Sequence, residues 1–163
     1  MIIQLENLAD VRRQHANEKI ALTTGTFDLL HVGHVRYLEA VKSLGDIMVV
    51  MLSGDNRVKA RKGPKRPIIP ENDRAKLLDA LKVVDYVFID PATSSPDTID
   101  PVHAGIVATL QPDIYATDGP DPRFWNIVEA SKLVIVPRSE GEDVSTSAII
   151  EHISGLVPLP ERE

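Results

Sequence analysis

Five short apolar runs alternate with amphipathic stretches along the chain, and this alternation constrains the fold more than any other feature. The run Ile47–Leu52 is apolar at every position, as expected for a strand that is buried on both faces of a sheet. The other four runs are residues 19–24, 83–89, 113–117 and 133–136. Because helical patterns separate the runs, the strands should be parallel and joined by helical crossovers. The sequence therefore predicts an α/β protein with a doubly wound parallel sheet.

Length and composition limit the organisation of the chain and its partners. The 163 residues suffice for one core, so we expect a single domain over residues 1–163, with its core at 19–153 and a tail at 154–163. The formal charge of −6 argues against a polyanion-binding surface, and no apolar run approaches the ~20 residues of a membrane span. Cysteine is absent, which excludes disulfides and thiolate metal sites. We expect a cytoplasmic protein that binds neither nucleic acid nor membranes.

The basic residues are unevenly distributed. Six of the 18 lie between Arg57 and Arg66, where no acidic residue occurs. Pro64, Pro67 and Pro70 favour a loop here, because proline disrupts helices. A charge run of this kind is most often a solvated surface. The alternative is an anion-binding loop on an otherwise acidic protein.

A glycine and two histidines follow the first predicted strand. Residues 24–34 read TGTFDLLHVGH, and a glycine between a first strand and a helix is where α/β proteins hold phosphates. The segment is neither a dinucleotide fingerprint nor a P-loop, since it lacks both glycine patterns. The imidazoles of His31 and His34 could donate hydrogen bonds to phosphate oxygens. A buried structural pair or a metal pair is the alternative, and Asp28 could hold a hard ion that also binds phosphate.

This segment resembles the His-x-Gly-His signature of cytidylyltransferase-like nucleotidyltransferases. The resemblance extends from Ile20 to Ile153 and includes three further blocks, at residues 54–70, 72–87 and 138–150. The first two blocks look most like the adenylyltransferase domain of ADP-heptose synthases. The last looks more like the cytidylyltransferases that act on glycerol 3-phosphate, choline phosphate and ethanolamine phosphate. The resemblance implies a Rossmann-like sheet of five strands in the order 3-2-1-4-5, with helices on both faces.

The resemblance also implies a reaction. A phosphate of the acceptor attacks the α-phosphorus of ATP or CTP, with Mg²⁺ accompanying the triphosphate, and pyrophosphate leaves. Such a displacement needs alignment and charge neutralisation more than a strong base. A small phosphorylated sugar or polyol is the expected acceptor, and a homodimer is the expected assembly. Two alternatives are an enzyme that adenylylates FMN and a nucleotide-binding regulatory module without catalysis.

Carried over by position, the resemblance assigns roles to individual residues. The expected catalytic residues are His31, His34 and Lys59. The expected nucleotide-binding residues are Thr24, Gly25, Thr26, Phe27, Asp118, Arg138, Ser145, Thr146 and Ser147. The expected acceptor-binding residues are Asp55, Lys62, Arg66 and Arg74. Asp28 would bind the metal together with phosphate oxygens. Arg74 could equally lie on a helix surface, and residues 145–147 could equally form a plain helix cap.

The chain departs from the family pattern at two places. Glu142 and Asp143 add two acidic residues before the last predicted helix, which weakens the role carried over to Arg138. The sequence Asp118-Gly119-Pro120 stands where many relatives have a lysine or histidine. Because this loop borders the base and ribose in the family, the choice between ATP and CTP stays open.

Overall fold

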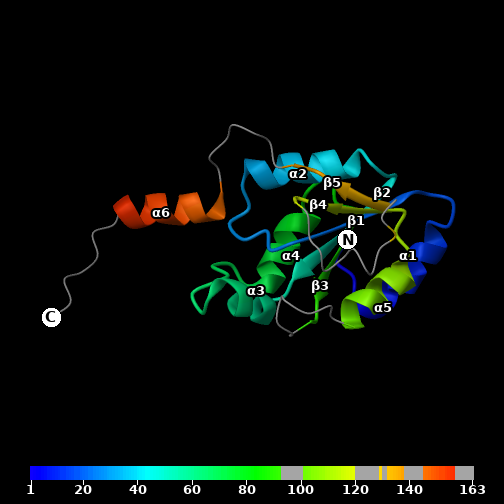
Figure 1. Ribbon diagram of the computed structural model, residues 1–163, viewed down its shortest axis with the longest axis horizontal. Helices are drawn as coiled ribbons and strands as arrows, with labels where there is room; N and C mark the ends of the chain where they lie inside the picture. Colours follow the sequence, from blue (N-terminus) through cyan, green and yellow to red (C-terminus); the bar gives the residue numbers. More distant parts are fainter. Residues whose placement is uncertain (93–100, 120–128, 130–131, 138–144, 157–163) are drawn as a thin grey trace.

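Five parallel strands form one sheet in the order β3-β2-β1-β4-β5 (Figure 1). This computed structural model describes residues 1–92, 101–119, 129, 132–137 and 145–156. The strands are β1 (Ile20–Gly25), β2 (Ile47–Ser53), β3 (Tyr86–Asp90), β4 (Ile114–Thr117) and β5 (Leu133–Ile135). The predicted strand order is confirmed, and the carboxyl ends of all five strands lie at one edge of the sheet.

Helices cover both faces of the sheet. The 3-10 turn η1 (Leu5–Asn7), α1 (Leu8–Gln14) and α5 (Pro101–Leu110) pack on one face, where Leu22, Met51 and Phe88 are buried. Helices α2 (Val32–Lys42) and α4 (Glu71–Asp79) pack on the other face, where Ala21, Val50 and Val87 are buried. Successive side chains point to opposite faces of a strand. The strands therefore have to be apolar at nearly every position, as their sequences indicate.

Residues 1–3 protect the outer edge of β3. The Ile3 N–H donates to the Val87 carbonyl at 2.9 Å, and the Val87 N–H donates to the Met1 carbonyl at 3.0 Å. An unpaired strand edge would be open to pairing with other chains. The N-terminal residues thus continue the sheet beyond β3.

The expected basic loop is in fact largely a helix, α3 (Asp55–Lys62). The prediction was wrong because all three prolines follow the helix and cannot disrupt it. Gly63, with φ 91°, ends α3, and only residues 63–70 lack regular structure. Asp55 lies in the first turn and three basic residues lie in the last, which is the charge order that a helix dipole favours. The basic side chains up to Lys62 are therefore presented by a rigid element.

The remaining helix, α6 (Thr146–Leu156), extends away from the sheet (Figure 1). The helix expected near residues 124–131 and the end of the expected tail lie outside the described residues, apart from Glu129. Among the residues that are described, no helix has the length and apolar character needed to span a membrane.

Gly54 allows α3 to approach the end of β3. A Cβ atom at Gly54 would lie 2.8 Å from the Asp90 carbonyl oxygen, whereas a Cβ at Gly105, within α5, would meet nothing within 4 Å. We expect Gly54→Ala to lower the free energy of unfolding by about 1–3 kcal/mol, because a backbone oxygen cannot move aside cheaply. The matched Gly105→Ala should raise it by about 0.5–1 kcal/mol through helix propensity. Urea denaturation of both variants measures the difference, and the same sign of effect in both would contradict the close approach.

Candidate functional site

The loop between β1 and α2 lies at the carboxyl edge of the sheet and has an unusual backbone. Phe27 and Leu29 have φ values of 46° and 47°, in the left-handed region that residues other than glycine rarely adopt. His31 occupies the N-cap position of α2. Backbone strain of this kind is concentrated at functional sites in proteins. The loop is therefore a candidate for the centre of the site.

Three aromatic rings stack in this loop. A Cβ atom at Gly25 would lie 2.6 Å from the Phe27 ring, so only glycine leaves room for that ring. The Phe27 ring meets the His34 imidazole edge to face, with 5.4 Å between centroids, and His34 stacks on His31 at 3.8 Å. The structure thus brings the two expected histidines together. The supporting role of the Phe27 side chain was not anticipated, since the sequence suggested a role only for its backbone.

Asp28 fixes the loop to the segment that follows α3. Its carboxylate is 1% exposed and accepts hydrogen bonds from Arg66 Nε at 2.9 Å and from the Ile68 and Ile69 N–H groups at 3.0 Å. Burial alone raises the pKa of Asp28, but the hydrogen bonds and the Arg66 charge outweigh it, so the pKa is lowered from its ordinary value of 3.8. Asp28 is therefore a buried, ionised anchor.

The structure does not support a metal-binding role for Asp28. Both of its carboxylate oxygens are already occupied by hydrogen-bond donors, which leaves a cation no favourable approach. The described residues also contain no cluster of three or more His, Asp or Glu side chains that could hold a metal ion. These residues do not form a protein cage for Mg²⁺, and the hydrogen bonds of Asp28 disfavour its expected role as a metal ligand beside phosphate oxygens.

Arg74 occupies neither of its two expected positions. The side chain is fully buried rather than on a helix surface. Its guanidinium donates to the carbonyls of Thr26 and Ser53 at 2.6 and 3.0 Å, and to Asp55 Oδ1 at 2.6 Å. Through these bonds Arg74 joins the ends of β1 and β2 to the start of α3. One sequence signal could have indicated this burial. Arg74 precedes Leu78 by four residues, so the two share one face of α4, and that face is the buried one.

Helix α3 presents cations beside the histidine loop. Arg61 Nη2 donates to Thr26 Oγ1 at 2.6 Å and so joins the last turn of α3 to the loop after β1. Lys59 and Lys62 are exposed on the same helix. Arg66, a predicted acceptor ligand, is paired with Asp28, and Asp55 is paired with Arg74. These two acceptor-binding predictions therefore fall on residues that already form ion pairs within the protein, whereas Lys59 and Lys62 lie at the surface.

The start of α6 also reaches the loop. Thr146 Oγ1 donates to the Asp28 carbonyl at 2.6 Å, across 118 residues of sequence. Ser145 Oγ accepts the Ala148 N–H at 3.1 Å, so the helix-cap interpretation holds for Ser145. Ser147 is exposed. The Thr146 hydroxyl therefore contacts the histidine loop, and the expected role of residues 145–147 in nucleotide binding stays a prediction.

The end of β4 lies next to the end of β1 in the sheet, which places Asp118 and Thr24 at the same edge. Asp118 is exposed. Arg138, Glu142, Asp143 and Pro120 lie outside the described residues, so their expected roles stay predictions.

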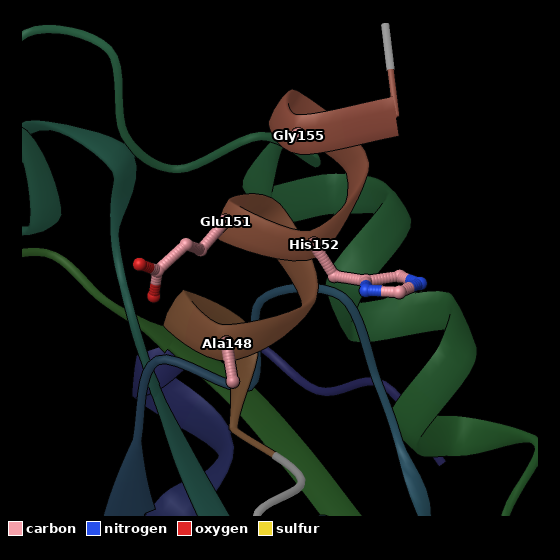
Figure 2. A pocket seen from close by; sticks show the side chains of 4 residues that line it. All are labelled: Ala148, Glu151, His152 and Gly155. Carbon is pink, nitrogen blue, oxygen red and sulfur yellow. The ribbon is translucent and has the colours of Figure 1, made fainter.

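A hollow of about 480 Å³ runs along α6 and is lined by Ala148, Glu151, His152 and Gly155 (Figure 2). The side chains of Glu151 and His152 point to different sides of the helix (Figure 2), so they do not converge on one ligand atom. The hollow is therefore a poor candidate for a reaction centre. The histidine loop, which the Arg61 guanidinium and the Thr146 hydroxyl both reach, is suited to binding an anion.

The Asp28 anchor predicts a pH-dependent stability. A carboxyl whose pKa is lowered in the folded state stabilises that state fully above its unfolded pKa of about 3.9, and loses this effect as the pH falls through the folded value. Asp28→Asn should lower the free energy of unfolding by about 3 kcal/mol at pH 7, because Arg66 stays buried without its partner. The loss should shrink as the pH is lowered below 4, as followed by urea denaturation.

The matched control is Asp73→Asn. Asp73 forms an exposed ion pair with Lys76 at 3.0 Å, and such pairs contribute at most about 1 kcal/mol. A loss at Asp28→Asn that does not change between pH 7 and pH 3 would show that its ionisation does not hold the loop.

Comparisons with known proteins agree with this geometry. A family model described as cytidylyltransferase-like matches residues 22–152. The chain is 42% identical over 153 residues to the bifunctional protein HldE of Helicobacter pylori strain G27, covering 93% of this chain and 31% of that protein. It is 40% identical over 152 residues to HldE of Citrifermentans bemidjiense, covering 88% and 29%. The chain thus spans about a third of the length of these curated relatives.

Solved structures share the fold. A lipopolysaccharide core biosynthesis protein from Thermoplasma volcanium GSS1 superposes with a TM-score of 0.59 at 29% identity, covering 76% of this chain and 99% of that one. Pantoate-beta-alanine ligase from Francisella tularensis gives a TM-score of 0.61 at 15% identity, covering 94% and 77%, which shows the fold alone. Since the family model covers most of the chain, this protein belongs to the cytidylyltransferase-like family and is a nucleotidyltransferase.

Proposed function

We propose that this nucleotidyltransferase moves AMP or CMP from ATP or CTP to a small phosphorylated sugar or polyol. The observation that carries the proposal is the stacked His31–His34 pair at the start of α2, 3.8 Å apart and beside the cationic helix α3. Imidazole donors and a helix N-terminus, with exposed lysines on the adjoining helix α3, suit a reaction that brings two phosphates together.

In the proposed reaction, an oxygen of the acceptor phosphate forms a bond to the α-phosphorus. The bond from that phosphorus to the oxygen that bridges the α- and β-phosphates breaks, and its electron pair leaves with pyrophosphate. The acceptor phosphate is already ionised near pH 7, so no strong base is needed. His31 and His34 donate hydrogen bonds to phosphate oxygens, and Lys59 attracts both anions. Donors fixed before the reaction stabilise the charge of the transition state more than that of the ground state.

Magnesium, where it accompanies the triphosphate, neutralises part of the phosphate charge. The described residues do not themselves form a site for it, and no step above depends on it. The base of the nucleotide stays open between adenine and cytosine. FMN as the acceptor and a regulatory module without catalysis are the alternatives, and a homodimer is the predicted assembly.

Two measurements test the proposal. The first compares the melting temperature with ATP, CTP, GTP and UTP, each with Mg²⁺, and we expect ATP or CTP to stabilise the protein most, since a ligand stabilises only the state that binds it. The second measures pyrophosphate release with that nucleotide and glycerol 3-phosphate, ribitol 5-phosphate, a hexose 1-phosphate, a heptose 1-phosphate or FMN. Release of pyrophosphate with FMN and with no other acceptor would favour an enzyme that adenylylates FMN. Nucleotide binding without pyrophosphate release in any mixture would favour a regulatory module without catalysis.

The histidine pair gives a mechanistic prediction. His34→Ala should lower kcat by about 10²–10³-fold, the effect of removing one donor to a developing charge, while the dissociation constant of the triphosphate changes little. The matched control, His152→Ala, changes an exposed histidine on α6 and should leave kcat unchanged. Steady-state kinetics and calorimetric titration measure the two quantities. Equal losses in binding and in kcat would mean that His34 only binds the ground state.

A further inference from the structure

A charged cluster lies at the end of β3, at the same carboxyl edge of the sheet as the histidine loop. It consists of Arg57 on α3, Asp90 at the end of β3 and His103 on α5, which are 6%, 2% and 4% exposed. His103 Nε2 lies 2.7 Å from Asp90 Oδ2, and the Ala92 N–H donates to Asp90 Oδ1 at 2.9 Å. Two donors therefore hold the Asp90 carboxylate without Arg57, and each of its oxygens keeps a second acceptor position.

The guanidinium of Arg57 is poorly satisfied by the protein. Its Nε lies 3.8 Å from Asp90 Oδ2, which is too far for a hydrogen bond. Its Nη1 is buried and has no hydrogen-bond partner in the described part of the chain. A buried donor without a partner costs folding free energy and is uncommon in proteins. Arg74 provides the contrast within the same fold, since it donates four hydrogen bonds.

Helix α3 connects this cluster to the histidine loop. Arg57 faces Asp90 of β3, and Arg61 donates to Thr26 after β1. The two arginines are four residues apart and so share one face of the helix. Because β2 lies between β3 and β1, the ends of β3 and β1 are separated by about two strand spacings, or about 10 Å. A small molecule whose phosphate lies in the histidine loop could extend along α3 to Arg57.

We propose that Arg57, Asp90 and His103 form the far end of the acceptor subsite, where they recognise hydroxyl groups of a polyol chain or sugar. This inference rests on the proposed function. A hydroxyl oxygen would accept the unused Nη1–H of Arg57, and its own proton would be donated to the Asp90 carboxylate. His103 holds that carboxylate in place. The cluster thus selects the hydroxyl-bearing part of the acceptor, whereas the histidine loop binds its phosphate.

The test separates recognition of the acceptor from folding. Arg57→Met should raise the KM of the sugar or polyol phosphate that releases pyrophosphate fastest by tenfold or more, the loss expected for a hydrogen bond to a charged group. The KM of the triphosphate should stay the same. Arg57→Lys keeps a charge beside Asp90 but loses the planar fork, so it should restore the melting temperature without restoring the acceptor KM. The matched control, Arg13→Met, makes the same change at an exposed arginine of α1 and should alter neither KM.

Calorimetric titration reads the subsite apart from catalysis. Ribitol 5-phosphate, a heptose 1-phosphate and inorganic phosphate are titrated into the wild-type protein and into Arg57→Met, without triphosphate. Tighter binding of either organic phosphate by the wild type, with equal binding of inorganic phosphate by both, supports the subsite even where no pyrophosphate is released. An unchanged acceptor KM in a folded Arg57→Met variant overturns it, as does equal or absent binding of both organic phosphates. Loss of inorganic phosphate binding would also overturn it, since Arg57 would then bind phosphate rather than hydroxyls.

Discussion

The site depends on the burial of one carboxylate, that of Asp28. Asp28 is the third residue after β1, and its side chain holds the segment after α3 through Arg66, Ile68 and Ile69. Its backbone carbonyl accepts the Thr146 hydroxyl at the start of α6. One residue therefore joins three segments that are far apart in the sequence. A charge buried at the centre of the loop is tolerated because a guanidinium and two N–H groups neutralise and solvate it.

The remaining architecture follows from Arg74 and Gly54, which place α3 on the sheet edge. Arg74 satisfies carbonyls at the ends of two strands, where the ladder of hydrogen bonds stops and polar groups would otherwise be buried alone. Gly54 lets the first turn of α3 approach the end of β3 closely enough for Arg57 to face Asp90. The last turn of the helix can then lie beside the loop after β1, where Arg61 donates to Thr26.

Sequence reasoning succeeded where a local pattern determines the structure. Continuous apolar runs such as Ile47–Leu52 predicted the buried strands, and the glycine and histidines after β1 do lie together at the carboxyl edge of the sheet. It failed where the structure depends on partners distant in sequence. Arg57 and Asp90 are 33 residues apart, and no spacing rule indicates that they meet. Helix α3 was missed for a different reason. The three prolines prevent a helix only at residues 63–70, whereas we expected a loop from Arg57 onward.

The arginines of the site are paired with carboxylates, whereas its lysines are exposed. The net charge of the protein does not reveal this difference. Arg57, Arg66 and Arg74 each face a carboxylate, and the planar groups of Arg66 and Arg74 also hold loops and helices in place through hydrogen bonds. These pairs contribute no net charge, so they do not attract a polyanion from a distance. The exposed ammonium groups of Lys59 and Lys62 then supply the local positive charge. An acidic protein can in this way keep one small anion-binding edge while the rest of its surface repels larger polyanions.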